Sequence, residues 1–261
     1  MKANIKIIFG CLLAVSLATV AYGCKGKASN SDNGADTVAT AKPVGPTFNA
    51  DSAYTFTAAQ CDFGPRVMNS AAHDKCGKWI VEKFKEYGCD VQEQKADLKA
   101  YDGTVLKSTN IIARFNPEAK KRILICAHWD SRPWADNDPD SANHKKPVMA
   151  ANDGASGVAV MLELARQLQA DKKLKVGVDF VCFDAEDWGV PRWETRYPNA
   201  DDSWALGAQY YAKNFPTPVK PEFGILLDMV GGEGAQFYRE GMSVQFASDV
   251  VNRVWEAAKG A

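Results

Sequence analysis

The sequence lacks net charge and carries no long block of basic residues. Its 31 lysines and arginines are balanced by 32 aspartates and glutamates, which leaves a formal net charge of -1. The densest basic clusters are pairs such as Lys145-Lys146 and Lys172-Lys173. The composition therefore gives no electrostatic reason to expect binding to nucleic acid or to an anionic membrane surface.

Cysteine clusters with metal-ligand spacing are also missing. The seven cysteines do not resemble a zinc-cysteine site. Cys126 and Cys182 lie within apolar runs, and we expect them to be buried as small hydrophobic residues. An exported compartment would permit a disulfide among Cys61, Cys76 and Cys89, but no pairing follows from the sequence.

The apolar run Ile7–Tyr22 is too short for a membrane span and follows two lysines, as in a secretory signal peptide. It ends in small residues before Cys24, which resembles a bacterial lipoprotein signal. We therefore expect residues 1–23 to be removed and Cys24 to carry lipid. Tyr22 departs from the usual pattern, so cleavage nearby without lipidation is the alternative.

Residues 24–50 are rich in small and polar side chains and are expected to form a flexible tether. With 46% hydrophobic residues overall, the remaining segment 51–261 is long enough for one domain with its own core. We expect an exported protein that faces the periplasm or the cell surface and reaches a bacterial membrane through its lipid anchor only.

Strand and helix patterns alternate along this domain, and no internal repeats are present. The alternation predicts an α/β fold with three layers, in which helices flank a mostly parallel or mixed central sheet. The expected strands cover residues 89–94, 109–115, 122–128, 176–183 and 223–228, and the expected helices cover 70–87, 155–170, 203–214 and 243–258.

Polar side chains with metal or acid–base chemistry follow the ends of several expected strands. His128 closes one strand, Glu186 and Asp187 follow another, and Asp228 ends the last. Asp153 opens the helix that begins near residue 155. If the strands are parallel neighbours, these groups meet at one edge of the sheet and offer a zinc-type ligand set. Each residue could instead have a structural role, as a hydrogen-bonded histidine, a helix cap or a loop acid.

Adjacent side chains on an extended backbone point in opposite directions. One member of the Glu186-Asp187 pair can therefore hold a metal while the other faces a substrate and serves as a general base. Five of the seven tryptophans fall on the segment from 129 to 204. We expect these indoles to line a pocket or to pack its loops together.

Three segments carry a resemblance to a known family: His-Trp-Asp-Ser-Arg-Pro-Trp-Ala-Asp at 128–136, Ala-Asn-Asp-Gly-Ala-Ser-Gly at 151–157 and Phe-Asp-Ala-Glu-Asp at 183–187. From about residue 50 to the end, the chain resembles bacterial glutaminyl cyclases (glutaminyl-peptide cyclotransferases) of the animal type. The resemblance implies a zinc aminopeptidase-like fold and one zinc ion. It also implies substrates that are peptides or proteins with N-terminal glutamine, which is converted to pyroglutamate with release of ammonia.

The same resemblance implies residue roles. Asp153 and Asp187 would ligate zinc. Glu186 would be the general acid/base, and Asp228 would support proton transfer. Trp193 would form a wall for the substrate side chain.

His128 matches a ligand of the second zinc in the related di-zinc aminopeptidases, and in the one-zinc cyclases it would stand just outside the ligand set. The family's third zinc ligand is a histidine in a Trp-His-Thr-like segment, but this sequence has no histidine after His144. We therefore expect that position to lie beyond Ala261 and zinc to bind weakly unless His128 substitutes. Two alternatives to the cyclase stay open: a zinc-dependent aminopeptidase with two metals, and a non-catalytic peptide-binding surface lipoprotein.

Overall fold

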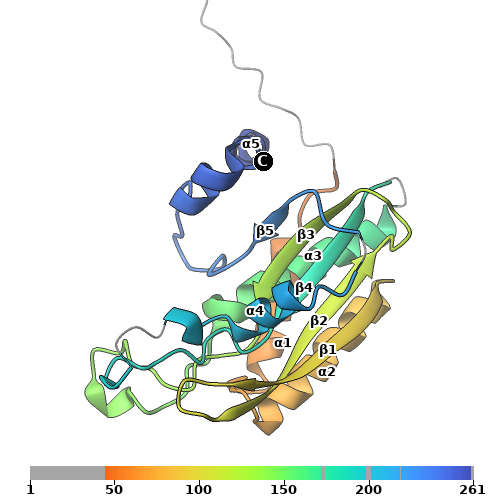
Figure 1. Cartoon of the computed structure of the whole chain (residues 1–261). Helices are drawn as coiled ribbons and strands as arrows, with labels where there is room; N and C mark the ends of the chain where they lie inside the picture. The colour runs from red at the N-terminus through yellow and green to blue at the C-terminus, as the bar shows by residue number, and fades with distance from the viewer. Residues whose placement is uncertain (1–44, 172–173, 198–200, 218, 260–261) are drawn as a thin grey trace, which may run out of the picture. The chain divides into compact units, whose positions relative to one another are not determined.

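Five strands build one mixed sheet in the computed structural model, which describes residues 45–171, 174–197, 201–217 and 219–259 (Figure 1). The strands are β1 (Asp90–Lys99), β2 (Val105–Phe115), β3 (Arg122–His128), β4 (Gly177–Phe183) and β5 (Gly224–Leu226). The helices are α1 (Ala50–Cys61), α2 (Ala71–Glu86), α3 (Ser156–Ala170), α4 (Leu206–Lys213) and α5 (Gly241–Ala258).

The strand order is β1-β2-β4-β3-β5. β3 runs parallel to both β4 and β5, whereas β2 pairs antiparallel with β1 and β4. The carboxyl ends of β3, β4 and β5 therefore lie at the same edge, as the sequence predicted. The expected fold class is confirmed, with a sheet that is mixed because β1 and β2 form an antiparallel hairpin.

Helices cover both faces of the sheet and make three layers. On one face, Phe84 of α2 stacks on Phe180 of β4 with 5.6 Å between ring centroids, and Met161 of α3 joins the same cluster. On the other face, Tyr211 of α4 packs against Ile112 and other strand residues. β4 and the last three residues of β3 are almost entirely buried, so the ends of these two strands are held on a close-packed scaffold.

The structure confirms the expected start and end of α2. The side chain of Ser70 caps the helix by accepting a hydrogen bond from the backbone N–H of His73 at 3.1 Å. Gly88 follows the helix with φ +76°, a conformation that favours glycine. Cys126 and Cys182 are buried as predicted, and burial raises the pKa of the Cys126 thiol to about 12.

Helix α1 was not expected from the sequence. Asn49 caps it by accepting a hydrogen bond from the backbone N–H of Ser52, and its own N–H donates to Glu163 of α3 at 3.3 Å. The end of the expected tether is thus bonded to the domain. Helix α1 has no continuous apolar stripe that would mark it in the sequence, and only Ala53 and Gln60 of the helix are buried.

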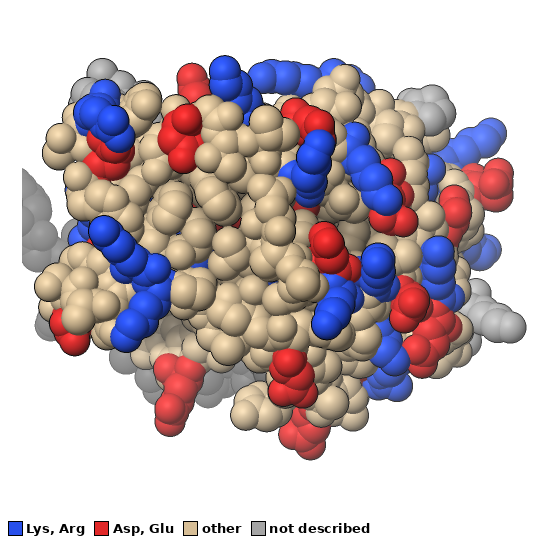
Figure 2. All heavy atoms as spheres, turned by 90° about the horizontal axis from the view of Figure 1, so that it is seen from below, with Lys and Arg blue, Asp and Glu red and all other residues tan. Residues whose placement is uncertain are grey.

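The expected signal peptide, Cys24 and most of the tether lie outside the described residues. Among the residues that are described, no helix is long and apolar enough to cross a membrane. On the face of the molecule seen from below, basic and acidic side chains are interspersed, so this face carries both signs of charge (Figure 2).

Candidate metal and proton-transfer site

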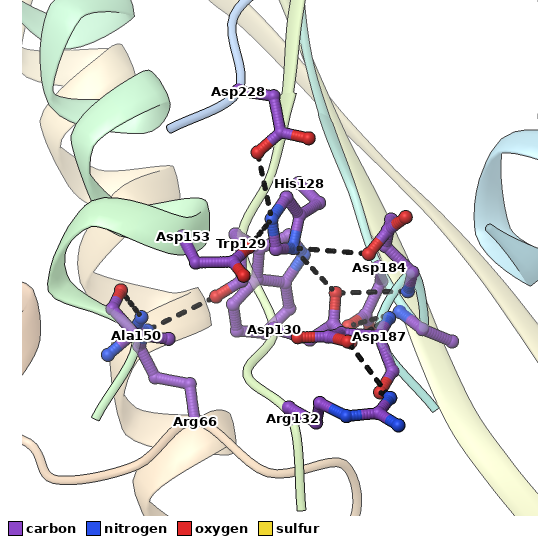
Figure 3. A network of polar contacts seen from close by, with 12 residues as sticks. Arg66, His128, Trp129, Asp130, Arg132, Ala150, Asp153, Asp184, Asp187 and Asp228 are labelled. Carbon is purple, nitrogen blue, oxygen red and sulfur yellow. Dashed lines mark hydrogen bonds and ion pairs between the residues drawn. The ribbon is translucent and has the colours of Figure 1, made fainter. Parts of the chain in front are cut away.

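The candidate residues converge where β3, β4 and β5 end. His128 is the last residue of β3, Glu186 and Asp187 follow β4, and Asp228 lies just beyond β5. Asp153 comes from the turn before α3, in which Gly154 has φ +94°. Figure 3 shows the carboxylates of Asp153 and Asp228 next to the His128 imidazole.

His128 is buried at the centre of the group and has a carboxylate near each ring nitrogen. Its Nε2 lies 2.8 Å from Asp153 Oδ1 and 3.8 Å from Asp228 Oδ1. Its Nδ1 lies 3.5 Å from Asp130 Oδ1 and 3.9 Å from Glu186 Oε2. Burial acts to lower the pKa of His128, but hydrogen bonding to Asp130, Asp153 and Asp228 outweighs burial and raises that pKa well above the ordinary value.

His128, Asp153 and Asp228 form a group that can hold a metal. One donor atom from each lies within 4.8 Å of the others, and this is the only such group found among the described residues. The side chains of Asp153 and Asp228 are 43% and 51% exposed, so the group is open to solvent on one side. One imidazole nitrogen and two carboxylate oxygens are typical zinc donors.

Glu186 is aimed at this group by the turn that follows β4. Ala185 has φ +50°, which is costly for a residue with a Cβ and is a form of strain found at functional sites. The side chain of Glu186 is 32% exposed. Burial is the main cause that raises the pKa of Glu186, and repulsion from neighbouring carboxylates raises it further. The charge of His128 acts in the opposite direction, and the net result is a pKa of about 7.

Asp187 is held by an arginine rather than by the three-residue group. Its Oδ1 accepts a hydrogen bond from Arg132 Nη1 at 3.2 Å, and the same guanidinium forms a bidentate pair with Asp136. Asp187 is 5% exposed, and burial together with the charges of Asp130, Asp153 and Glu186 raises its pKa to about 8. The structure thus places Asp187 beside the group, in a site with an excess of negative charge.

Trp193 belongs to an aromatic cluster on the loops beside the site. Its ring lies 6.0 Å from that of Trp134 and is stacked on His144 at 6.2 Å, and Trp134 is 5.5 Å from Trp188. Trp193 is 44% exposed. The expected packing of tryptophans between loops is confirmed, and the outer ring of the cluster faces solvent.

Two polar residues hold the segment that carries Asp228. Asn152 Oδ1 accepts a hydrogen bond from the backbone N–H of Gly231 at 2.8 Å, and Ser156 Oγ accepts one from that of Val230 at 3.1 Å. Both residues lie in the 151–157 segment, but no role was predicted for them. Their spacing of four residues at a helix start was the available signal.

Asp130 and Arg66 were also missed. Asp130 is fully buried and accepts hydrogen bonds from the backbone N–H groups of Glu186 and Asp187. Arg66 is fully buried too and donates to three backbone carbonyls, those of Trp129, Met149 and Ala150. The position of Asp130, two residues after His128, could have suggested its role, whereas nothing local indicated that of Arg66.

The fold and this strand-end set of imidazole and carboxylates are those of a peptidase-like α/β class. The model of peptidase family M28 matches residues 110–261, more than half of the sequence. The chain therefore belongs to peptidase family M28.

Solved structures of bacterial proteins are similar over most of the chain. A glutaminyl cyclase from Tannerella forsythia is 52% identical, and a Zn-dependent exopeptidase from Parabacteroides distasonis is 50% identical. Each match covers 82% of this chain and 73% of the other, with a TM-score of 0.79. The resemblance to bacterial glutaminyl cyclases and the zinc aminopeptidase-like fold are thereby confirmed.

A curated relative from Drosophila melanogaster, a glutaminyl-peptide cyclotransferase, is 27% identical over 67% of this chain and 47% of its own length. The chain spans less than half the length of the curated relatives it matches.

Proposed function

We propose that the chain carries the acid–base centre of a zinc-dependent glutaminyl-peptide cyclotransferase, an acyltransferase that acts on peptides or proteins with N-terminal glutamine. The observation that carries the proposal is the position of Glu186, half-buried and 3.9 Å from His128 at the edge where three strands end. The similarity to glutaminyl cyclases of about half identity supports the choice of reaction.

The residues present fit a bound zinc ion. Four carboxylates lie within 3.9 Å of the His128 ring nitrogens, so negative charge exceeds positive charge around this buried imidazole. Buried charges in proteins are paired or coordinate metals. In the one-zinc arrangement implied by the family, Asp153 and Asp187 would hold the ion. Zinc, when bound, supplies polarisation of an amide oxygen.

The chain's own residues account for the proton transfers. Glu186 accepts a proton from the α-amine of the N-terminal glutamine, and the amine nitrogen then forms a bond with the γ-carboxamide carbon. The bond from this carbon to the amide nitrogen breaks, and Glu186 returns the proton to the departing ammonia. Asp228 supports the transfer through His128. An attack within one residue depends chiefly on positioning, which a rigid strand-end site provides.

A zinc-dependent aminopeptidase is the second candidate. The His128–Asp153–Asp228 group favours it, because it could hold a metal and because His128 matches a ligand of the second zinc in the di-zinc aminopeptidases that the chain resembles. The similarity to a Zn-dependent exopeptidase points the same way. The aminopeptidase hypothesis requires two zinc ions and a water molecule that attacks the peptide bond.

One experiment separates the two candidates. The purified chain is loaded with zinc, its metal content is measured, and it is incubated with a peptide that begins with glutamine. The cyclase reading predicts one zinc per chain, ammonia release and a pyroglutamyl peptide of unchanged length. Two zinc ions with release of free N-terminal glutamine would establish the aminopeptidase. If neither product forms, both candidate functions are rejected.

Lipid anchoring at Cys24 and a location facing the periplasm or cell surface belong to the same proposal. Mass spectrometry of the membrane fraction from bacteria that express the whole sequence would test it. The proposal expects an N-terminal lipid on Cys24, and an unmodified N-terminus in the soluble fraction would contradict it.

A further inference from the structure

His73 of α2 links the two strand ends that carry His128 and Glu186. Its Nε2 is 2.8 Å from Asp184 Oδ1, and both side chains are almost fully buried. Its ring also stacks on Trp129, with 4.1 Å between centroids and 18° between planes. Since Trp129 follows His128 and Asp184 precedes the acid pair, one imidazole contacts both turns.

Asp184 controls the strained turn that aims Glu186. Its Oδ1 accepts a hydrogen bond from the backbone N–H of Ala185 at 3.0 Å, and its Oδ2 accepts one from that of Thr109 at 2.6 Å. Ala185 is the residue with φ +50°. A positive φ in alanine persists only when surrounding contacts over-determine it. The His73–Asp184 contact belongs to that set of contacts.

Helix α2 is shaped to hold Trp129. Gly77 lies one turn after His73 on the same face of the helix, and a Cβ at Gly77 would come within 2.8 Å of the Trp129 ring. Trp129 Nε1 donates to Thr109 O at 3.2 Å, so Thr109 bonds to both Trp129 and Asp184. The indole and the Asp184 carboxylate are thus fixed to one another from two sides.

We propose that His73 is a positioning residue, which sets the Glu186 carboxylate against the His128 imidazole through Asp184 and Trp129. It does not touch the substrate. The effect of His73 on kcat rests on the proposed function, whereas its effect on the conformation of the turn at Ala185 does not.

The test uses His73→Phe, which keeps a flat ring on Trp129 and removes the contact with Asp184. Hydrogen exchange of the Ala185 amide should accelerate by about tenfold, because Asp184 loses the partner that orients it. In the zinc-loaded protein, kcat should fall about 10- to 100-fold with KM changed by less than about threefold. His73→Gln, whose amide can donate to Asp184, should restore part of the amide protection.

The matched control is Asp179→Asn, which breaks the buried Arg122–Asp179 pair (2.7 Å) earlier in β4. It should lower stability while leaving the Ala185 amide and kcat as in the parent. If His73→Phe leaves the amide protection unchanged, or if both variants lower kcat in proportion to stability, the positioning role is overturned. Altered exchange in a chain without cyclase or peptidase activity would support the positioning role and reject the proposed function.

Discussion

The carboxylate of Asp130 accepts a hydrogen bond from the backbone N–H of Glu186 at 3.0 Å. It also accepts one from the backbone N–H of Asp187 at 3.1 Å, and its Oδ1 lies 3.5 Å from His128 Nδ1. Burial acts to raise the pKa of Asp130, but the His128 contact and these backbone N–H groups outweigh it and lower that pKa. One buried side chain therefore fixes the acid pair relative to the imidazole.

Replacement of Asp130 by asparagine should damage both activity and stability. The amide has one oxygen where the carboxylate has two, so one backbone N–H of the acid pair loses its acceptor. We expect kcat to fall about 100-fold and the free energy of unfolding to fall by about 1–3 kcal/mol. Steady-state kinetics and urea unfolding measure these changes.

Ser131→Ala is the matched control for Asp130. Ser131 is also fully buried, and its hydroxyl has no hydrogen-bond partner in the part of the chain that the structure describes. Its removal leaves no donor or acceptor of another residue unpaired, so Ser131→Ala should destabilise the protein much less than Asp130→Asn. Equal effects of the two substitutions would contradict the role given to Asp130.

Two single substitutions distinguish the two candidate sets of zinc ligands. If one zinc is held by Asp153 and Asp187, Asp187→Asn should weaken zinc binding by at least about tenfold, while Asp228→Asn should keep most of the affinity. Calorimetric titration of zinc measures both. A larger loss of zinc affinity in Asp228→Asn than in Asp187→Asn would instead assign the ion to the His128–Asp153–Asp228 group.

Gly157 allows α3 to approach the strand ends closely. An added Cβ would overlap Leu227 O and come within 2.8 Å of the Ala127 Cβ. Gly157→Ala should therefore cost about 1–3 kcal/mol of stability. Gly241→Ala provides the control, because nothing lies within 4 Å of its added Cβ. Similar thermal unfolding of both variants would rule out the close contact.

Glu163 should make the domain sensitive to acid. Burial acts to raise its pKa, but hydrogen bonds from Arg166 and Gln167 outweigh burial and lower it below the ordinary 4.5. A carboxyl with a lowered folded-state pKa stabilises the protein above its ordinary pKa, and this contribution disappears as the pH falls through the folded-state value. Glu163→Gln should therefore be less stable than the parent by about 1–2 kcal/mol at neutral pH, and the difference should vanish in acid.

Urea unfolding as a function of pH checks this expectation. Glu256→Gln is the control, because Glu256 pairs with Lys259 in an exposed contact on α5, and such pairs contribute little. A pH-independent difference between Glu163→Gln and the parent would show that the charge of Glu163 is not the cause.

The sequence predicted what depends on local pattern. The range of β3 is identical in prediction and structure, and α2 begins at its serine cap, because apolar runs and caps are read from neighbouring residues. The meeting of His128, Glu186 and Asp228 followed from parallel strands. Helix α1 and the pairing of Asp187 with Arg132 were missed. The first lacks an apolar stripe, and the second joins side chains 55 residues apart.

The most direct test of the account compares the parent chain with Glu186→Gln. Both are loaded with zinc, and ammonia release from a peptide with N-terminal glutamine is followed together with zinc content. The account predicts that the variant binds zinc like the parent and loses most of its turnover, because the side chain that accepts and returns the proton is then an amide. Near-parental turnover in Glu186→Gln would contradict the central claim.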